Sequence, residues 1–178
     1  KLKNNKAPGP DQATAEIYKW MNTENRKQLL EFINKIHEND KLEECLNLAN
    51  VASIFKKGDS SKLENYRPIS LLQTLYKIIA SLVKERIDAG LDSLIYKTQF
   101  GFRHDKSTAQ AIYLARRLMD MSEQTNRNLT IILLDWEKAF DKINPKKLIE
   151  VLTRLKVPPR MLKIITLIYQ TPKFAVKV

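Results

Sequence analysis

The sequence contains one cysteine, four glycines and no apolar run long enough to cross a membrane. The single cysteine, Cys45, excludes a disulfide framework and a cysteine-based zinc site, and it indicates a reducing compartment. Four glycines exclude Walker and dinucleotide-binding glycine patterns, and no Gly-x-Ser-x-Gly context supports a serine hydrolase. The longest mainly apolar run, residues 129–134, is far shorter than the roughly 18 residues that span a bilayer. The chain begins with Lys1 and lacks a secretory signal, which indicates a fragment.

Acidic residues are outnumbered, with 20 Asp and Glu against 31 Lys and Arg and a net charge of +11. Residues 1–60 are nearly neutral, with ten basic and nine acidic side chains, whereas residues 129–178 carry ten against four. This excess predicts a polyanionic partner, nucleic acid before membrane, although a merely solubilising charge remains an alternative from composition alone. With 178 residues, of which 43% are hydrophobic, the chain is long enough to bury a core as one continuous unit.

Hydrophobic periodicity predicts a helix-rich chain with few strands. The apolar spacing predicts helices over residues 14–37, 71–90, 107–121, 145–155 and 158–169. Prolines mark the start of the last two, and a glycine marks the end of the helix over residues 71–90. Short β-branched runs predict strands over residues 50–55, 129–134 and 174–178.

The predicted strand 129–134 leads directly into Asp135 and the sequence Trp-Glu-Lys-Ala-Phe-Asp. A carboxylate at the end of a rigid strand suits nucleotidyl transfer, in which two divalent metals clamp the attacking and leaving oxygens. The alternative is a solvated aspartate that caps the next helix, and on spacing alone this alternative is the more frequent one.

Cations flank a predicted turn, with Lys56 and Lys57 on one side and Arg67, followed by Pro68, on the other. Two cations on adjacent segments of a β-turn-β unit can hold a triphosphate, with arginine acting as a fork and lysine as a point charge. The alternative is an ordinary polar turn.

In residues 99–103, a glycine lies between two phenylalanines. This pattern indicates close approach to a partner with the rings as stacking groups, or else simple core packing.

Taken in order, these segments resemble the reverse transcriptase domain of non-LTR retrotransposons, the long interspersed element type. The matching stretches are Lys6-Ala7-Pro8-Gly9-Pro10-Asp11, residues 56–59, residues 65–72, residues 99–103 and residues 134–141. The resemblance implies an α+β fold, the fingers and incomplete palm of a right-hand polymerase, helix-rich with a small antiparallel sheet. It places residues 1–128 mainly in the fingers, with helices that pack on the palm, and residues 129–178 at the start of the palm.

The resemblance also implies roles for single residues. Asp135 matches the first catalytic aspartate, a ligand to two Mg²⁺ ions, and Trp136 lends a backbone carbonyl beside it. Phe140 matches the steric gate that rejects a ribose 2′-hydroxyl. Lys56 and Arg67 match the cations that hold the incoming dNTP, with Lys57 a weaker alternative to Lys56. The template-binding segment is represented by Gln99, Gly101 and Arg103.

The family's second acidic motif, an aromatic residue before paired aspartates, does not occur in the 178 residues. The resemblance therefore implies a truncated RNA-directed DNA polymerase domain that is inactive alone, whose parent uses an RNA template, a DNA primer and dNTPs. A catalytically inactive nucleic-acid-binding remnant and a group II intron-type reverse transcriptase are the alternatives. Function alone indicates an intracellular location, nuclear or cytoplasmic, with no membrane partner, and leaves the oligomeric state open.

Overall fold

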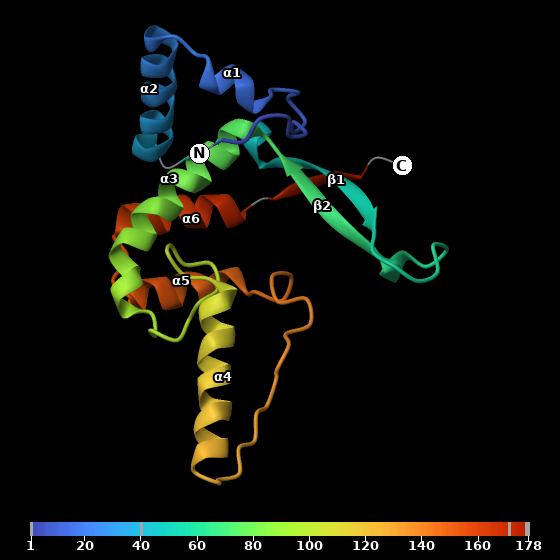
Figure 1. Ribbon diagram of the computed structural model, residues 1–178. Coiled ribbons are helices and arrows are strands. Elements are labelled where there is room, and N and C mark those ends of the chain that lie inside the picture. The colour runs from blue at the N-terminus through green and yellow to red at the C-terminus, as the bar shows by residue number, and fades with distance from the viewer. Residues whose placement is uncertain (1, 40, 171, 177–178) are drawn as a thin grey trace. The chain divides into compact units, whose positions relative to one another are not determined.

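The computed structural model describes residues 2–39, 41–170 and 172–176, and it confirms the α+β class (Figure 1). Two compact units are present: one holds the chain up to Arg86 together with the chain from Pro145 onward, and the other holds Ile87–Asn144. The helices are α1 (Ala15–Lys19), α2 (Thr23–Asn39), α3 (Thr74–Leu91), α4 (Thr108–Gln124), α5 (Pro145–Arg154) and α6 (Pro159–Gln170). The strands are β1 (Leu48–Phe55), β2 (Tyr66–Leu72) and β3 (Lys173–Val176). Among the described residues, no helix is long and apolar enough to cross a membrane.

The sheet of the first unit has the order β2-β1-β3. β1 and β2 form an antiparallel hairpin in which Ile54 lies opposite Arg67 and Phe55 opposite Tyr66. The rings of Phe55 and Tyr66 contact each other with centroids 5.4 Å apart, as expected of a cross-strand pair. β3 runs parallel to β1, so the sheet is mixed and the predicted antiparallel pairing holds for the hairpin only. The predicted strand 174–178 is confirmed as far as Val176, and its last two residues lie outside the described residues.

The hydrophobic core of the first unit lies where α2, α3 and α6 meet the segment before β1. Its buried members are Ile36, Leu42, Leu46 and Ile79. Partly buried side chains from α2, α3 and α6 pack against them: Phe32, Ile33, Leu75, Tyr76, Ile164, Leu167 and Ile168. Burying a side chain of this size contributes about 1.5–3 kcal/mol, so this cluster holds the helices against the base of the hairpin.

The loop at residues 6–11 packs against the junction between β2 and α3. A Cβ atom added to Gly9 would lie 2.5 Å from the backbone nitrogen of Gln73, so a side chain has no space there. The buried side chain of Gln73 donates to the Cys45 carbonyl at 2.7 Å, and Thr74 Oγ1 donates to the Ala13 carbonyl at 2.8 Å. The Gly9 approach and the Thr74 bond fix the N-terminal loop beside this junction, and the Gln73 bond joins the junction to the segment before β1.

Two predicted helices have different bounds in the structure. The predicted helix over residues 14–37 is divided into α1 and α2, because the Asn22 side chain accepts a hydrogen bond from the Asn25 backbone at 2.8 Å and so caps a new helix. The predicted helix over residues 71–90 starts only at Thr74, since residues 71–72 pair with β1. The other predicted helices are confirmed within about three residues at their ends, and Gln110 Oε1 accepts from the Ser107 backbone at 3.1 Å at the start of α4.

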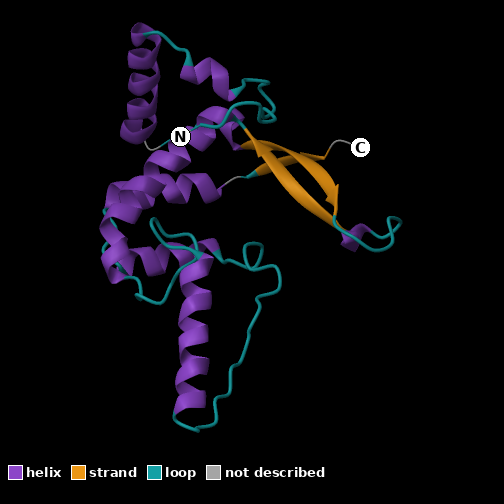
Figure 2. Cartoon of the chain, viewed as in Figure 1, coloured by secondary structure: helices purple, strands orange, loops and turns teal. Residues whose placement is uncertain are grey.

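The predicted strand over residues 129–134 is wrong for this structure, in which the stretch from Asn126 to Asn144 is loop (Figure 2). A strand requires a neighbour for its backbone hydrogen bonds, and within the described residues no segment pairs with this one. Its side chains are accordingly exposed, with Ile132 76% and Leu133 91% accessible. The apolar composition of the segment is therefore typical of a strand, but a strand also requires a partner, and composition does not predict one.

Candidate functional site

Lys56 and Arg67 lie on the same face of the β1–β2 hairpin. The Lys56 amide donates to the Asn65 carbonyl at 2.8 Å, which continues the pairing register one step beyond Phe55. Because Arg67 lies opposite Ile54, and Lys56 is two residues beyond Ile54, the two cations are diagonal neighbours. Both are exposed, so this face can accept a polyanion.

The hairpin turn is held by its own polar groups. The Ser61 amide and hydroxyl both donate to Asp59 Oδ1, at 2.9 and 2.7 Å, and these bonds lower the pKa of the Asp59 carboxyl. Asn65 Nδ2 donates to the Asp59 carbonyl at 2.8 Å, and Gly58 takes a φ of 93°, a conformation that favours glycine. The turn therefore keeps its acidic group engaged with the backbone.

A groove of about 430 Å³ lies where the N-terminal loop meets β1. Ala7, Pro8 and Gln12 form one side. Residues 50–53 of β1 and Leu71 of β2 form the other side. Because side chains alternate along a strand, Asn50 and Ala52 share the sheet face of Arg67. Val51 and Ser53 point to the opposite face, so the groove is not confined to the face of the two cations.

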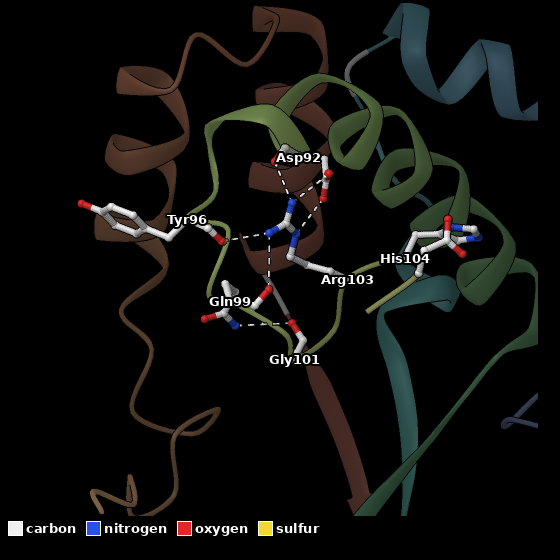
Figure 3. A network of polar contacts seen from close by, with 7 residues as sticks. Asp92, Tyr96, Gln99, Gly101, Arg103 and His104 are labelled. Carbon is white, nitrogen blue, oxygen red and sulfur yellow. Dashed lines mark hydrogen bonds and ion pairs between the residues drawn. The ribbon is translucent and has the colours of Figure 1, made fainter. Parts of the chain in front are cut away.

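In the second unit, Arg103 organises the loop that contains Gln99 and Gly101 (Figure 3). Its Nε donates to Asp92 Oδ1 at 2.8 Å, and its Nη2 donates to Asp92 Oδ2 at 2.9 Å and to the Asp92 carbonyl at 3.0 Å. Its Nη1 donates to the carbonyls of Tyr96 and Gln99, at 2.9 and 3.3 Å. An arginine has five N–H donors, and all five have acceptors here.

The electrostatic effect of this pair is mutual. The hydrogen bonds from Arg103 hold the pKa of the Asp92 carboxyl below its usual value, and the carboxylate raises the pKa of the guanidinium. The Arg103 side chain is 10% exposed and that of Asp92 56%. Arg103 is thus engaged within its own loop, and its predicted contact with template remains a prediction, as do those of Gln99 and Gly101, which are exposed.

Asp135, Trp136 and Phe140 lie in the exposed loop that follows α4. Trp136 is 83% and Phe140 76% exposed, and the Phe140 ring meets the Phe102 ring edge-on, with centroids 6.2 Å apart. Among the described residues, no group of three His, Cys, Asp or Glu side chains is placed to hold a metal ion. The described residues therefore do not form a complete metal site, and the role of Asp135 as a magnesium ligand remains a prediction.

The predicted site residues are divided between the two units. Lys56 and Arg67 belong to the first, and the second holds Gln99, Gly101, Arg103, Asp135, Trp136 and Phe140. Nothing in the sequence distinguishes Asp92, because an aspartate in a short turn before a loop matches no pattern. For Phe102 the sequence is compatible with both core packing and stacking, and the structure exposes the ring.

Comparison with known proteins identifies the family. The sequence profile described as "Reverse transcriptase (RNA-dependent DNA polymerase)" matches residues 54–177. The chain belongs to the reverse transcriptase family. This match includes the hairpin cations, the Gln99–Arg103 segment and Asp135.

The relatives within the family are non-LTR retrotransposon proteins, as the sequence motifs predict. The chain is 27% identical to the "Transposon TX1 uncharacterized 149 kDa protein" of Xenopus laevis, over 99% of this chain and 14% of that protein. It is 26% identical to the "RNA-directed DNA polymerase from mobile element jockey" of Drosophila funebris, over 99% of this chain and 19% of that protein. The chain therefore spans less than a fifth of the length of these relatives.

Proposed function

We propose that this chain forms the fingers and the first part of the palm of an RNA-directed DNA polymerase. Residues 1–128 are mainly fingers, and residues 129–178 begin the palm. The observation that carries the proposal is the common face of Lys56 and Arg67, which places two exposed cations diagonally on one hairpin within a reverse transcriptase sequence. The substrates are an RNA template, a DNA primer and dNTPs, and the site of action is intracellular, nuclear or cytoplasmic.

The incoming dNTP is held by the hairpin face. Arg67 presents a planar fork that matches two phosphate oxygens, and Lys56 adds a point charge that offsets the remaining negative charge. The hydrogen-bonded turn and the paired strands keep both cations on a rigid element. The two side chains therefore have a fixed geometry before the dNTP binds, rather than one that binding induces.

Asp135 is the catalytic carboxylate of this chain, Trp136 lends a backbone carbonyl to the metal or the nucleotide beside it, and Phe140 borders the sugar as the steric gate. Reverse transcriptases generally use divalent metal ions, here two Mg²⁺, and Asp135 contributes one ligand toward them. The described residues bring no three metal-binding side chains together, so we place the remaining ligands in the rest of the polymerase. Gln99 and Gly101 border the template, and Arg103 shapes their loop.

The experiment is primer extension on an RNA template by the complete polymerase that contains this chain. Asp135→Asn preserves size and removes the charge, and we expect incorporation to fall to background. We propose that Asp141, which ends the same motif, has a structural or outer-shell role and is not a metal ligand, so Asp141→Asn, a change of the same chemistry six positions along the same loop, is expected to retain incorporation. An active Asp135→Asn polymerase would overturn the assignment.

The 178-residue chain alone is proposed to bind nucleic acid without polymerising. This second function is favoured by the net charge of +11 together with the absence of a three-ligand metal cluster among the described residues. Metal-dependent nucleotide incorporation by the isolated chain would contradict it.

A further inference from the structure

Phe102 and Phe140 form an aromatic pair in the second unit. Their ring centroids are 6.2 Å apart and their planes are inclined by 84°, an edge-to-face geometry within the range that such pairs prefer. Phe102 is 89% and Phe140 76% exposed, so the pair buries little area and is not part of a hydrophobic core. A contact of this kind has more effect on where the rings lie than on folding.

The backbone under Phe102 is held in an unusual conformation. Its φ is 60°, in the left-handed region that few residues other than glycine adopt. The next residue, Arg103, donates to Asp92 and to the carbonyls of Tyr96 and Gln99, and Gln99 Nε2 donates to the Gly101 carbonyl at 3.3 Å (Figure 3). The loop on both sides of Phe102 is therefore fixed by hydrogen bonds, which directs the ring toward Phe140.

We infer that Phe102 is a second specificity-determining residue, whose ring holds Phe140 in the position from which it excludes ribonucleotides. This inference rests on the proposed function, in which Phe140 is the steric gate. It adds a positioning residue from a different segment of the chain, to which neither the motifs nor the family match assigns a role in sugar selection.

The physical reason is that exclusion by shape requires a ring that does not move aside. An exposed phenylalanine changes rotamer on the picosecond to nanosecond scale, so a gate on a loop can swing away from a 2′-hydroxyl. A ring packed edge-on against it restricts this motion. Removing Phe102 is therefore expected to relax selection of the sugar while leaving the deoxynucleotide reaction nearly intact.

The test measures kcat/KM for a dNTP and for the matching rNTP in the complete polymerase, and compares their ratio between variants. Phe140→Ala is expected to lower the dNTP preference by at least about tenfold. Phe102→Ala is expected to lower it by about 2- to 10-fold, the range that an aromatic pair corresponds to, with the dNTP value nearly unchanged. Phe102→Ala added to Phe140→Ala is expected to have no further effect, because the two rings act as one unit.

Two controls separate positioning from general damage. Phe102→Tyr keeps the ring and is expected to retain the full preference. Tyr113→Ala removes a 67% exposed aromatic ring from α4 and is expected to change nothing. An equal loss for both nucleotides in Phe102→Ala would indicate a damaged loop and overturn the inference.

The outcomes distinguish the two claims. If Phe140→Ala relaxes selection and Phe102→Ala does not, the inference fails and the gate stands. If Phe140→Ala leaves selection unchanged, the assignment of the gate fails, and the inference fails with it.

Discussion

Arg103 and Asp92 form a two-point ion pair in which Nε and Nη2 of the guanidinium reach the two carboxylate oxygens at 2.8 and 2.9 Å. The same guanidinium also binds three backbone carbonyls, so one side chain joins the turn after α3 to the loop at residues 96–103. Lysine would keep the charge, but it has three donors on a single nitrogen and cannot reproduce this planar arrangement.

The Arg103–Asp92 pair predicts that the stability of this loop decreases at acid pH. The pKa of Asp92 is held below its usual value near 3.8, first by the hydrogen bonds from Arg103 and then by smaller effects of Lys106 and His104. Because the folded pKa is lowered, the contribution of Asp92 to stability is fully present above about pH 4 and is lost as the pH falls through the folded pKa. Carbon-detected NMR titration of the Asp92 carboxyl measures this directly.

In Arg103→Lys the Asp92 pKa is expected to rise back toward 3.8. Arg117→Lys alters an exposed pair on α4, Arg117 with Asp120 at 3.3 Å, and is expected to leave the Asp92 titration unchanged. An Asp92 pKa that does not respond to Arg103→Lys would show that the pair does not hold this loop.

The close approach of Gly9 to Gln73 predicts opposite effects of two alanine substitutions. In Gly9→Ala the new Cβ would lie 2.5 Å from the Gln73 nitrogen, so the loop or α3 must shift. This shift is expected to lower the free energy of unfolding by about 1–3 kcal/mol. Gly90→Ala places its Cβ in open space within α3 and is expected to stabilise by about 0.5–1 kcal/mol, because glycine is unfavourable in helices. Denaturant unfolding of the 178-residue chain checks both, and equal midpoints for the two variants would contradict the packing.

The sequence predicts most of the helices of this fold, because proline at a helix start, a capping serine and regular apolar spacing are local signals. Asn22 shows one limit, since a single side-chain cap divides a continuous apolar pattern into α1 and α2. Residues 129–134 show a second limit, because an apolar composition indicates that a segment favours a buried strand but does not identify the strand that must pair with it. The parallel pairing of β3 with β1 is likewise set by contacts between distant segments.

The candidate site divides in the same way. The motifs place Lys56, Arg67 and Asp135 by type and order, and the register of the hairpin then shows that the two cations share a face. The five-donor role of Arg103 depends on acceptors as far as eleven residues away, which no local pattern records.

The hairpin face predicts different kinetic effects for two adjacent lysines. Arg67→Met and Lys56→Met remove charge from the proposed dNTP face and are expected to raise KM for the dNTP about tenfold or more, since hydrogen bonds to charged groups contribute about 1.5–3 kcal/mol. Lys57→Met is the matched control, because it is one residue beyond the paired register and outside the diagonal that joins Lys56 to Arg67. Steady-state kinetics of the complete polymerase at varied dNTP checks this, and a larger effect at Lys57 than at Lys56 would reassign the contact.

The uneven charge of the chain predicts a salt-sensitive affinity for single-stranded RNA. Residues 129–178 carry ten basic against four acidic side chains, whereas residues 1–60 carry ten against nine, so phosphate contacts are expected mainly from the C-terminal segment. Each contact releases counterions, so the logarithm of the binding constant falls with the logarithm of the salt concentration, with a slope of about −0.7 per phosphate.

The double variant Lys156→Ala with Arg160→Ala is expected to make this slope shallower by as much as about 1.4. The control, Lys27→Ala with Lys35→Ala on α2, is expected to leave the slope unchanged. Fluorescence anisotropy of a labelled RNA across a salt series measures the slope. An affinity that does not change with salt would mean that the positive charge serves solubility alone.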